Sequence, residues 1–179
     1  MNNNTAGKRK NGKLFPEENQ LIKIIGFGNI FMGDDGVGIR TIEILKKNLS
    51  ENVKFKENKN IEIIDGGTSG VDLVFLIKDA KKVIIVDAVD AGQQVGQIVT
   101  FKPEDIKGNF KKKRMIKSFS LHDMNLAEIF ELIKTLKLNT EIKIIGIKPK
   151  KIGYGDRLSG EIEAKIPDLV SMIYRELES

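Results

Sequence analysis

The amino-acid sequence predicts an α/β fold: a single domain with a doubly wound, mostly parallel sheet and helices on both faces. Short apolar runs typical of buried strands alternate along the chain with segments whose apolar residues recur at helical spacing. The 179 residues suit one hydrophobic core, and no segment repeats. The hydrophobic share of 40% and the charged share of 31% are those of a globular protein with a charged surface.

The strands are expected where apolar runs end at glycine or aspartate. Four runs predict buried strands: Leu21–Gly28, Ile61–Ile64, Lys82–Asp90 and Ile142–Ile147. A fifth segment, Gly96–Phe101, alternates more clearly and predicts an antiparallel or edge strand.

Helices are expected between these strands and after the last of them. Apolar residues at helical spacing predict four: Gly36–Leu49, Val71–Ile77, Asp123–Leu136 and Ser159–Leu177. The stretches Gln94–Ser120 and Lys148–Leu158 are less regular, and we expect them to form surface loops around a site. Residues 1–20 are polar and are expected to be a disordered tail before a domain spanning residues 21–179.

Composition limits the classes of function. The chain has no cysteine, which excludes disulfides, iron–sulfur clusters, thiolate zinc sites and a cysteine nucleophile. The net charge of +5 comes without aromatic interleaving or a nucleic-acid-binding motif, so no nucleic-acid partner is expected. No secretory signal and no apolar run long enough to cross a membrane is present, which predicts a soluble, cytoplasmic protein.

Acidic side chains and one imidazole follow several of the predicted strands. Ligands of open α/β sheets bind outside the carboxyl ends of the strands, near a topological switch point. Asp34 and Asp35 lie in the loop after the first strand, Asp65 ends the second and Asp87 lies near the end of the third. His122, the only histidine, precedes a predicted helix. These residues are therefore expected at one edge of the sheet.

Each of these acids also has a purely structural interpretation. Asp before glycine and a helix is a good N-cap, so one residue of the Asp34–Asp35 pair is expected to cap the helix and to leave the other for function. Asp65 precedes Gly66 and Gly67 and could simply build a turn. Asp87 directly follows an apolar run, where a charge is costly unless it is paired, which favours a functional role.

His122 lies in the sequence Ser-Leu-His-Asp, with Ser120 as a candidate N-cap. A lone histidine is more often structural than functional. At a helix start, however, the helix dipole favours the neutral imidazole that binds metals. One imidazole and two carboxylates form a mixed nitrogen and oxygen set, which suits zinc or nickel with coordination positions left open.

A dinucleotide site is the alternative suggested by Gly26-Phe27-Gly28 after the first strand. The third glycine of the fingerprint would fall at Phe31, and two carboxylates in the following loop would repel a pyrophosphate. Asp65 nevertheless mimics the acid that binds ribose, so this alternative stays open.

Five segments together resemble the [NiFe]-hydrogenase maturation proteases. They are, in order, GFGNIFMGDDGVG (Gly26–Gly38), DGGTSG (Asp65–Gly70), IIVDAV (Ile84–Val89), SLHDMNL (Ser120–Leu126) and IGIKP (Ile145–Pro149). The resemblance runs from about Ile22 to Tyr174. The combination is specific, although any one segment would be a weak signal.

The resemblance implies a doubly wound α/β fold and an endopeptidase. Members of that family remove a C-terminal extension from a hydrogenase large-subunit precursor after nickel has been inserted. Their metal-binding positions fall on Asp35, Asp87 and His122, which would be both the metal ligands and the catalytic residues. The nickel is expected to arrive with the client, although another divalent metal could occupy the site.

Two features depart from the family pattern or extend it. Lys150 and Lys151 lie where family members often carry an acid, and residues 1–20 form a basic extension. These departures leave the identity of the client open, not the family. Two other functions also stay open: a non-hydrolytic metal- or client-binding maturation factor, and a nucleotide-dependent oxidoreductase.

Overall fold

The computed structural model describes residues 21–51, 60–68, 72–105, 118–119, 134–135 and 140–179. Its sheet has the strand order β2-β1-β3-β6-β4, and β5 pairs with β3 outside this path. The strands are β1 (Ile22–Gly26), β2 (Ile61–Asp65), β3 (Lys82–Asp90), β4 (Ile98–Phe101), β5 (Ser118–Phe119) and β6 (Glu141–Ile147). Strands β2, β1, β3 and β6 are parallel, and β4 is an antiparallel edge strand, as its alternating pattern predicts.

The strand order places a topological switch point between β1 and β3. From β1 the chain crosses to β2 on one side and then returns to β3 on the other side. The pairing of β1 with β3 runs from Ile22 opposite Lys82 to Gly26 opposite Val86. The carboxyl ends of β1 and β3 are therefore adjacent, where ligands of open α/β sheets bind.

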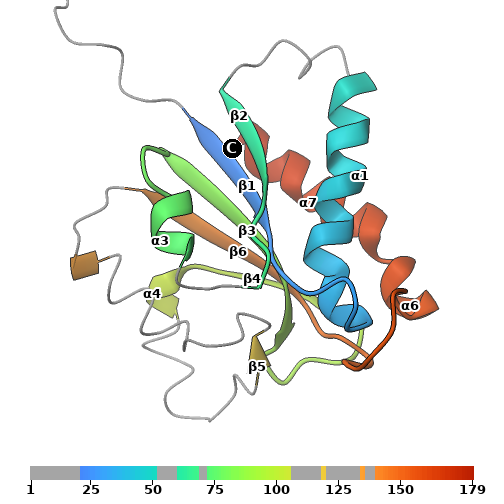
Figure 1. Ribbon diagram of the computed structural model, residues 1–179. Helices are drawn as coiled ribbons and strands as arrows, with labels where there is room; N and C mark the ends of the chain where they lie inside the picture. The colour runs from blue at the N-terminus through green and yellow to red at the C-terminus, as the bar shows by residue number, and fades with distance from the viewer. Residues whose placement is uncertain (1–20, 52–59, 69–71, 106–117, 120–133, 136–139) are drawn as a thin grey trace, which may run out of the picture.

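Helices cover both faces of the sheet (Figure 1). Helices α1 (Val37–Glu51), α6 (Gly160–Glu163) and α7 (Ile166–Glu178) lie on one face, and α3 (Leu73–Leu76) and the short α4 (Pro103–Asp105) lie on the other. A 3-10 turn, η1 (Asp34–Gly36), leads directly into α1. The α/β fold with a mostly parallel sheet, predicted from the alternation of strand and helix patterns, is confirmed.

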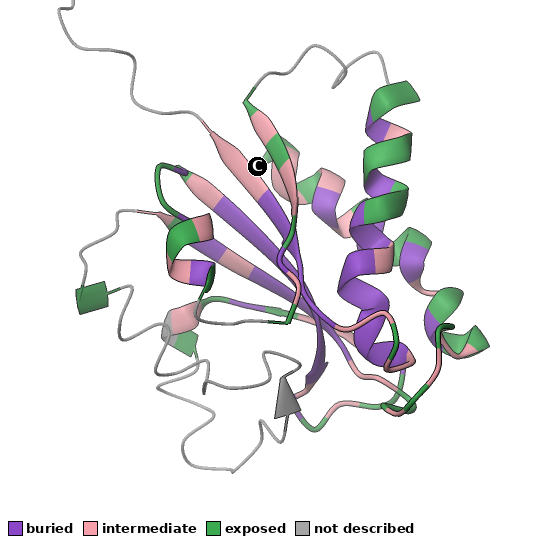
Figure 2. Cartoon of the chain, viewed as in Figure 1, coloured by how far each residue is buried: buried purple, intermediate pink, exposed green. Residues whose placement is uncertain are grey.

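Two hydrophobic clusters form the core, one on each face of the sheet. Ile25, Val83 and Ile85 pack with Leu73 and Ile77 on the α3 face. Ile24, Ile84 and Val86, which alternate with them, join a cluster with α1 and α7 on the other face. The central strands and the sheet-facing side of α1 are accordingly buried (Figure 2). Burial on both faces explains why these strands read as continuous apolar runs.

Glycine lets α1 begin very close to the sheet. A Cβ atom on Gly38 would lie 2.2 Å from the carbonyl oxygen of Phe27 and 2.4 Å from that of Val86. Only a residue without a side chain allows this approach. It brings η1, immediately before α1, against the end of β3.

Two predicted helices differ from the structure or lie largely outside it. The single helix expected over Ser159–Leu177 is wrong: α6 ends at Glu163 and α7 begins at Ile166. Pro167 has no N–H and would clash with a carbonyl one turn earlier, so it occupies the first turn of a new helix. The helix expected over Asp123–Leu136 lies outside the described residues except for 134–135, which are helical. No helix within the described residues is long and apolar enough to cross a membrane.

Candidate functional site

The loop after β1 folds back so that the Asp35 side chain meets the loop's own start. Gly28 has a φ of 130°, and its N–H donates to the carbonyl oxygen of Gly67, 2.9 Å away. The next residue, Asn29, donates its backbone N–H to Oδ2 of Asp35 at 2.8 Å. Asp35 is fully buried. A buried carboxylate is costly, and this hydrogen bond offsets part of that cost and orients the group.

Asp87 lies in the last part of β3 and is also buried, with 1% of its surface exposed. Its Oδ1 accepts a hydrogen bond of 2.8 Å from the backbone N–H of Ala88. Because η1 contacts β3, the elements that carry Asp35 and Asp87 meet beside the switch point. The structure thus brings two buried acids to the same edge of the sheet.

His122, the third predicted ligand, lies outside the described residues. Among the described residues, no group of three histidine, cysteine or acidic side chains could hold a metal ion. Because His122 lies outside the described residues, the three-ligand site stays a prediction. The nearest described segment before it is β5, whose Phe119 pairs with Val89 of β3.

Asp34 is buried and binds a different loop. Its Oδ2 accepts hydrogen bonds of 2.9 Å each from the backbone N–H of Lys150, the backbone N–H of Lys151 and the Oγ of Ser159. Its Oδ1 accepts a fourth bond, of 2.6 Å, from the backbone N–H of Ser159. Asp34 therefore joins the first loop to the segment between β6 and α6.

The structure corrects the expected capping role of the acid pair. The N-cap position of η1 is Gly33, with no side-chain capping bond, and Asp34 and Asp35 both lie inside the turn. Asp34 bonds to residues more than 100 positions away, and Asp35 bonds back to Asn29. One acid of the pair does serve structure, as expected, but by tertiary contacts rather than by capping.

Asp65 builds a turn at the end of β2. It is exposed, and its Oδ1 accepts a 2.8 Å hydrogen bond from the backbone N–H of Gly67. This is the local aspartate turn expected as the structural interpretation of the residue.

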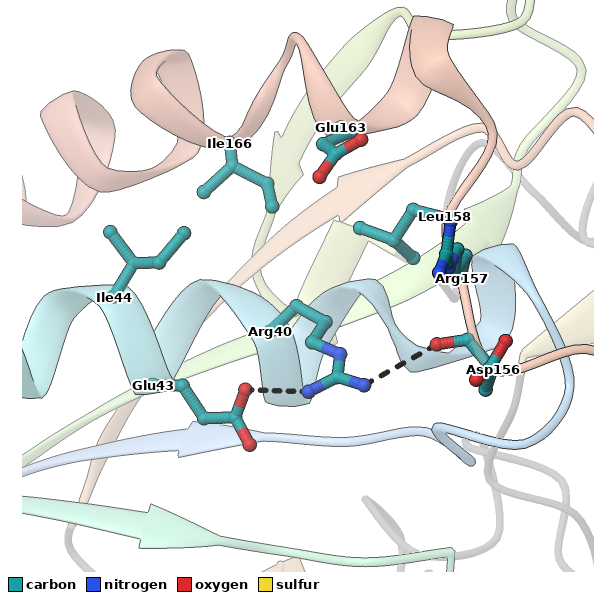
Figure 3. A pocket seen from close by; sticks show the side chains of 8 residues that line it. All are labelled: Arg40, Glu43, Ile44, Asp156, Arg157, Leu158, Glu163 and Ile166. Carbon is teal, nitrogen blue, oxygen red and sulfur yellow. Dashed lines mark hydrogen bonds and ion pairs between the residues drawn. The ribbon is translucent and has the colours of Figure 1, made fainter.

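A separate pocket lies between α1 and the segment that leads into α7. Figure 3 shows Arg40 on its wall, donating to Oε2 of Glu43 at 3.0 Å and to the carbonyl oxygen of Asp156 at 3.4 Å. Neither Asp35 nor Asp87 lines this pocket, whose described residues are Arg40, Glu43, Ile44, Asp156, Arg157, Leu158, Glu163 and Ile166. It is therefore distinct from the candidate site at the switch point.

The pairing of the two loops was not predicted from the sequence. Gly33 donates its N–H to the carbonyl oxygen of Gly155 at 2.9 Å, and Gly155 donates to that of Phe31 at 3.0 Å. The sequence does predict a loop over Lys148–Leu158 beside the site, but the partners of Asp34 are too distant along the chain to leave a local pattern. The only feature of the sequence that could have indicated this pairing was the presence of a second acid beside Asp35.

Comparison with known proteins identifies the family. The family model for hydrogenase maturation proteases matches residues 40–176. A Methanocaldococcus jannaschii chain assigned to the hydrogenase maturation proteases is 31% identical over 157 residues, which is 87% of each chain. The hydrogenase expression/formation protein HupD of Thiocapsa roseopersicina is 27% identical over 84% of this chain, and the match spans 65% of HupD.

A solved structure agrees with this assignment. The [NiFe] hydrogenase maturation protease HybD of Thermococcus kodakarensis superposes with a TM-score of 0.67 and 26% identity, covering 87% of this chain and 98% of HybD. The shared fold, the family match and the identity over most of the chain point the same way, and they favour a peptidase over the nucleotide-dependent alternative. The chain belongs to the hydrogenase maturation protease family, a family of peptidases.

Proposed function

We propose that this chain is an endopeptidase that removes a C-terminal extension from a [NiFe]-hydrogenase large-subunit precursor after nickel insertion. Asp35, Asp87 and His122 would bind the client's nickel, which is part of the substrate rather than a resident cofactor. Recognition of that ion would restrict cleavage to precursors whose metal has been loaded.

The observation that carries this proposal is the pair of buried carboxylates at the switch point. Asp35 and Asp87 come from different elements, η1 and β3, that contact each other beside the carboxyl ends of β1 and β3. Two buried acids placed together at a ligand-binding edge suit a cation better than an anionic cofactor such as a dinucleotide.

Chain length supports His122 as the third ligand. Phe119 pairs with Val89, two residues beyond Asp87, and His122 follows Phe119 by three residues. Three residues span at most about 11 Å, so the length of the chain allows His122 to reach the end of β3. Imidazole with two carboxylates is a donor set that nickel accepts.

The reaction is hydrolysis of one peptide bond in the client. The oxygen of a water molecule bonds to the scissile carbonyl carbon, the C–N bond breaks, and the departing nitrogen takes a proton, which leaves a new carboxyl group and a new amine. A metal ion at the site supplies Lewis acidity near the scissile carbonyl. Asp35 and Asp87 orient the substrate through its metal, and a carboxylate of the site accepts the proton of the water.

The direct test is a precursor cleavage assay. Purified protein is mixed with large-subunit precursor prepared with and without nickel, and the precursor mass is measured over time. We expect loss of a C-terminal fragment only from the nickel-loaded precursor, and loss of that activity in Asp87→Asn. Asp168→Asn is the matched control, because Asp168 is an exposed acid on α7 that forms an ion pair of 3.0 Å with Lys165.

The same assay separates the rival function. A precursor that binds the protein but keeps its full mass would contradict the peptidase and support a non-hydrolytic maturation factor. Equal cleavage of nickel-loaded and nickel-free precursor would keep the peptidase but refute recognition through nickel.

A further inference from the structure

Asp34 accepts hydrogen bonds from residues more than 100 positions away in the chain. It is 1% exposed, and its two oxygens accept four hydrogen bonds from Lys150, Lys151 and Ser159. Three of the donors are backbone N–H groups, so the recognition depends on the shape of this segment more than on its side chains. The oxygens of Asp34 are therefore directed at residues 150–159, the second loop, and not at a ligand.

The two loops that Asp34 joins are also paired along their backbones. The N–H of Asp34 donates to the carbonyl oxygen of Lys151 at 3.2 Å, and Gly153 donates to that of Met32 at 3.2 Å. With the exchange between residues 31–33 and 155, the first loop is bonded to the second from residue 31 to residue 34. The second loop is in turn held to α1, where Arg40 donates to the carbonyl oxygen of Asp156 at 3.4 Å (Figure 3).

Asp35 directly follows the segment of the first loop that is paired with residues 150–159. Its Oδ2 accepts from the N–H of Asn29, two residues before the paired segment begins, and its backbone follows Asp34 directly. A change in the separation of the two loops would therefore move Asp34 and, with it, the backbone that carries Asp35.

We propose that Asp34 is a positioning residue, which fixes the 150–159 segment against the first loop and thereby sets the place of the Asp35 carboxylate. This inference rests on the proposed role of Asp35 in binding the client. It assigns to the segment after β6 a direct effect on the site, although that segment carries none of the predicted ligands.

The test uses Asp34→Asn in the full-length protein. An asparagine has one acceptor oxygen and one NH₂ group. If its oxygen takes the place of Oδ2, its NH₂ faces the N–H of Ser159, and a donor opposes a donor. A single hydrogen bond to a charged acceptor is worth about tenfold or more in an opening equilibrium. Native-state amide exchange by NMR should therefore speed up by at least about tenfold at Asn29, Gly33 and Gly155.

Two further readouts and two further variants complete the experiment. Core amides of β3, such as that of Ile85, should keep their exchange rates, and kcat/KM for precursor cleavage should fall by at least about tenfold. Ser159→Ala removes only the hydroxyl donor and should shift both readouts in the same direction by a smaller factor. Asp168→Asn, with the same chemical change on exposed α7, should shift neither.

Each other outcome overturns the inference. Slower cleavage with unchanged exchange at Asn29 would make Asp34 a direct contact of the client. Faster exchange with unchanged kcat/KM would show that the loop pairing does not act on the site. A uniform rise in the exchange rate of every amide would show that Asp34 contributes only to the general stability of the fold. If the wild-type protein cleaves no precursor, the proposed function fails, and the exchange at Asn29 still decides whether Asp34 holds the Asp35 loop.

Discussion

Substitution of Gly28 by alanine should destabilise the fold at the point where β1 turns into the site loop. The backbone of Gly28 has a φ of 130°, a region that residues with a Cβ rarely adopt. A Cβ atom there would also lie 1.9 Å from the carbonyl oxygen of Asp35 and 2.9 Å from its carbonyl carbon. Both are backbone atoms, so no side-chain rotation can relieve the clash.

The expected cost has two parts. The unfavourable φ costs about 1–3 kcal/mol, and insertion of a methyl group into filled space costs about 1–3 kcal/mol more. We therefore expect Gly28→Ala to lower the free energy of unfolding by about 2–6 kcal/mol. Because the displaced atom belongs to Asp35, precursor cleavage by the folded fraction should fall as well.

Two other glycines provide matched controls. Gly67 also has a positive φ, of 58°, but a Cβ there would have nothing within 4 Å. Gly67→Ala should therefore cost only about 1 kcal/mol, from the backbone conformation alone. A Cβ on Gly160, the first residue of α6, also meets nothing within 4 Å, and alanine there should be neutral or stabilising by up to about 1 kcal/mol.

Equilibrium unfolding in urea, followed by circular dichroism, measures the free energy of unfolding of all three variants. The dependence of that free energy on urea concentration should be the same for each. The order Gly28, then Gly67, then Gly160 separates the clash from the backbone strain. If Gly28→Ala lies within about 1 kcal/mol of Gly67→Ala, the close approach of the loop to Asp35 is wrong.

Three further predictions concern other parts of the chain. His122→Ala should abolish precursor cleavage, because two carboxylates alone hold nickel poorly, and should cost no more than about 1 kcal/mol in a thermal or urea melt. Deletion of Met1 to Glu18 should leave the melting temperature unchanged, since this polar segment offers little apolar area to bury. The hydrogen bond from Lys102 lowers the pKa of the Glu141 carboxyl below its ordinary value. The small stabilisation from this interaction is present above the pKa that Glu141 has in the unfolded chain, and it is lost as pH falls through the pKa of the folded protein. Glu141→Gln should therefore lower the free energy of unfolding at pH 7 and match the wild type in acid.

Each of these has an outcome that contradicts it. Near-normal cleavage by His122→Ala would refute both the ligand set and the proposed mechanism, whereas a large loss of stability with a matching loss of activity would make the histidine structural. A marked drop in melting temperature after the deletion would show that the N-terminal segment packs on the domain. For Glu141→Gln, a difference from wild type that persists unchanged in acid would exclude the ion pair as its cause.

Much of the fold could be read from local patterns. The continuous apolar runs of β1, β3 and β6 predict strands buried on both faces, and the structure confirms this with one hydrophobic cluster on each side. The alternation in Gly96–Phe101 predicts an edge strand, which β4 is. Such patterns succeed because burial periodicity is a local property of the chain. The break before α7 was missed because the spacing of its apolar residues continues through Pro167, while the backbone cannot.

The sequence by itself determined which acids were candidates, and the tertiary structure decided which groups each of them contacts. Asp35 and Asp87 are 52 positions apart, and only the placement of β3 beside β1 brings their elements together. Residue type and helical spacing do not distinguish Asp34 from Asp35, and only the family resemblance points to Asp35. The two acids differ because the carboxylate of Asp34 meets three N–H groups and a hydroxyl from a loop more than 100 residues later, whereas that of Asp35 meets its own loop at Asn29. Contacts between distant segments depend on strand order and loop packing. Local residue types and their spacing do not predict these contacts.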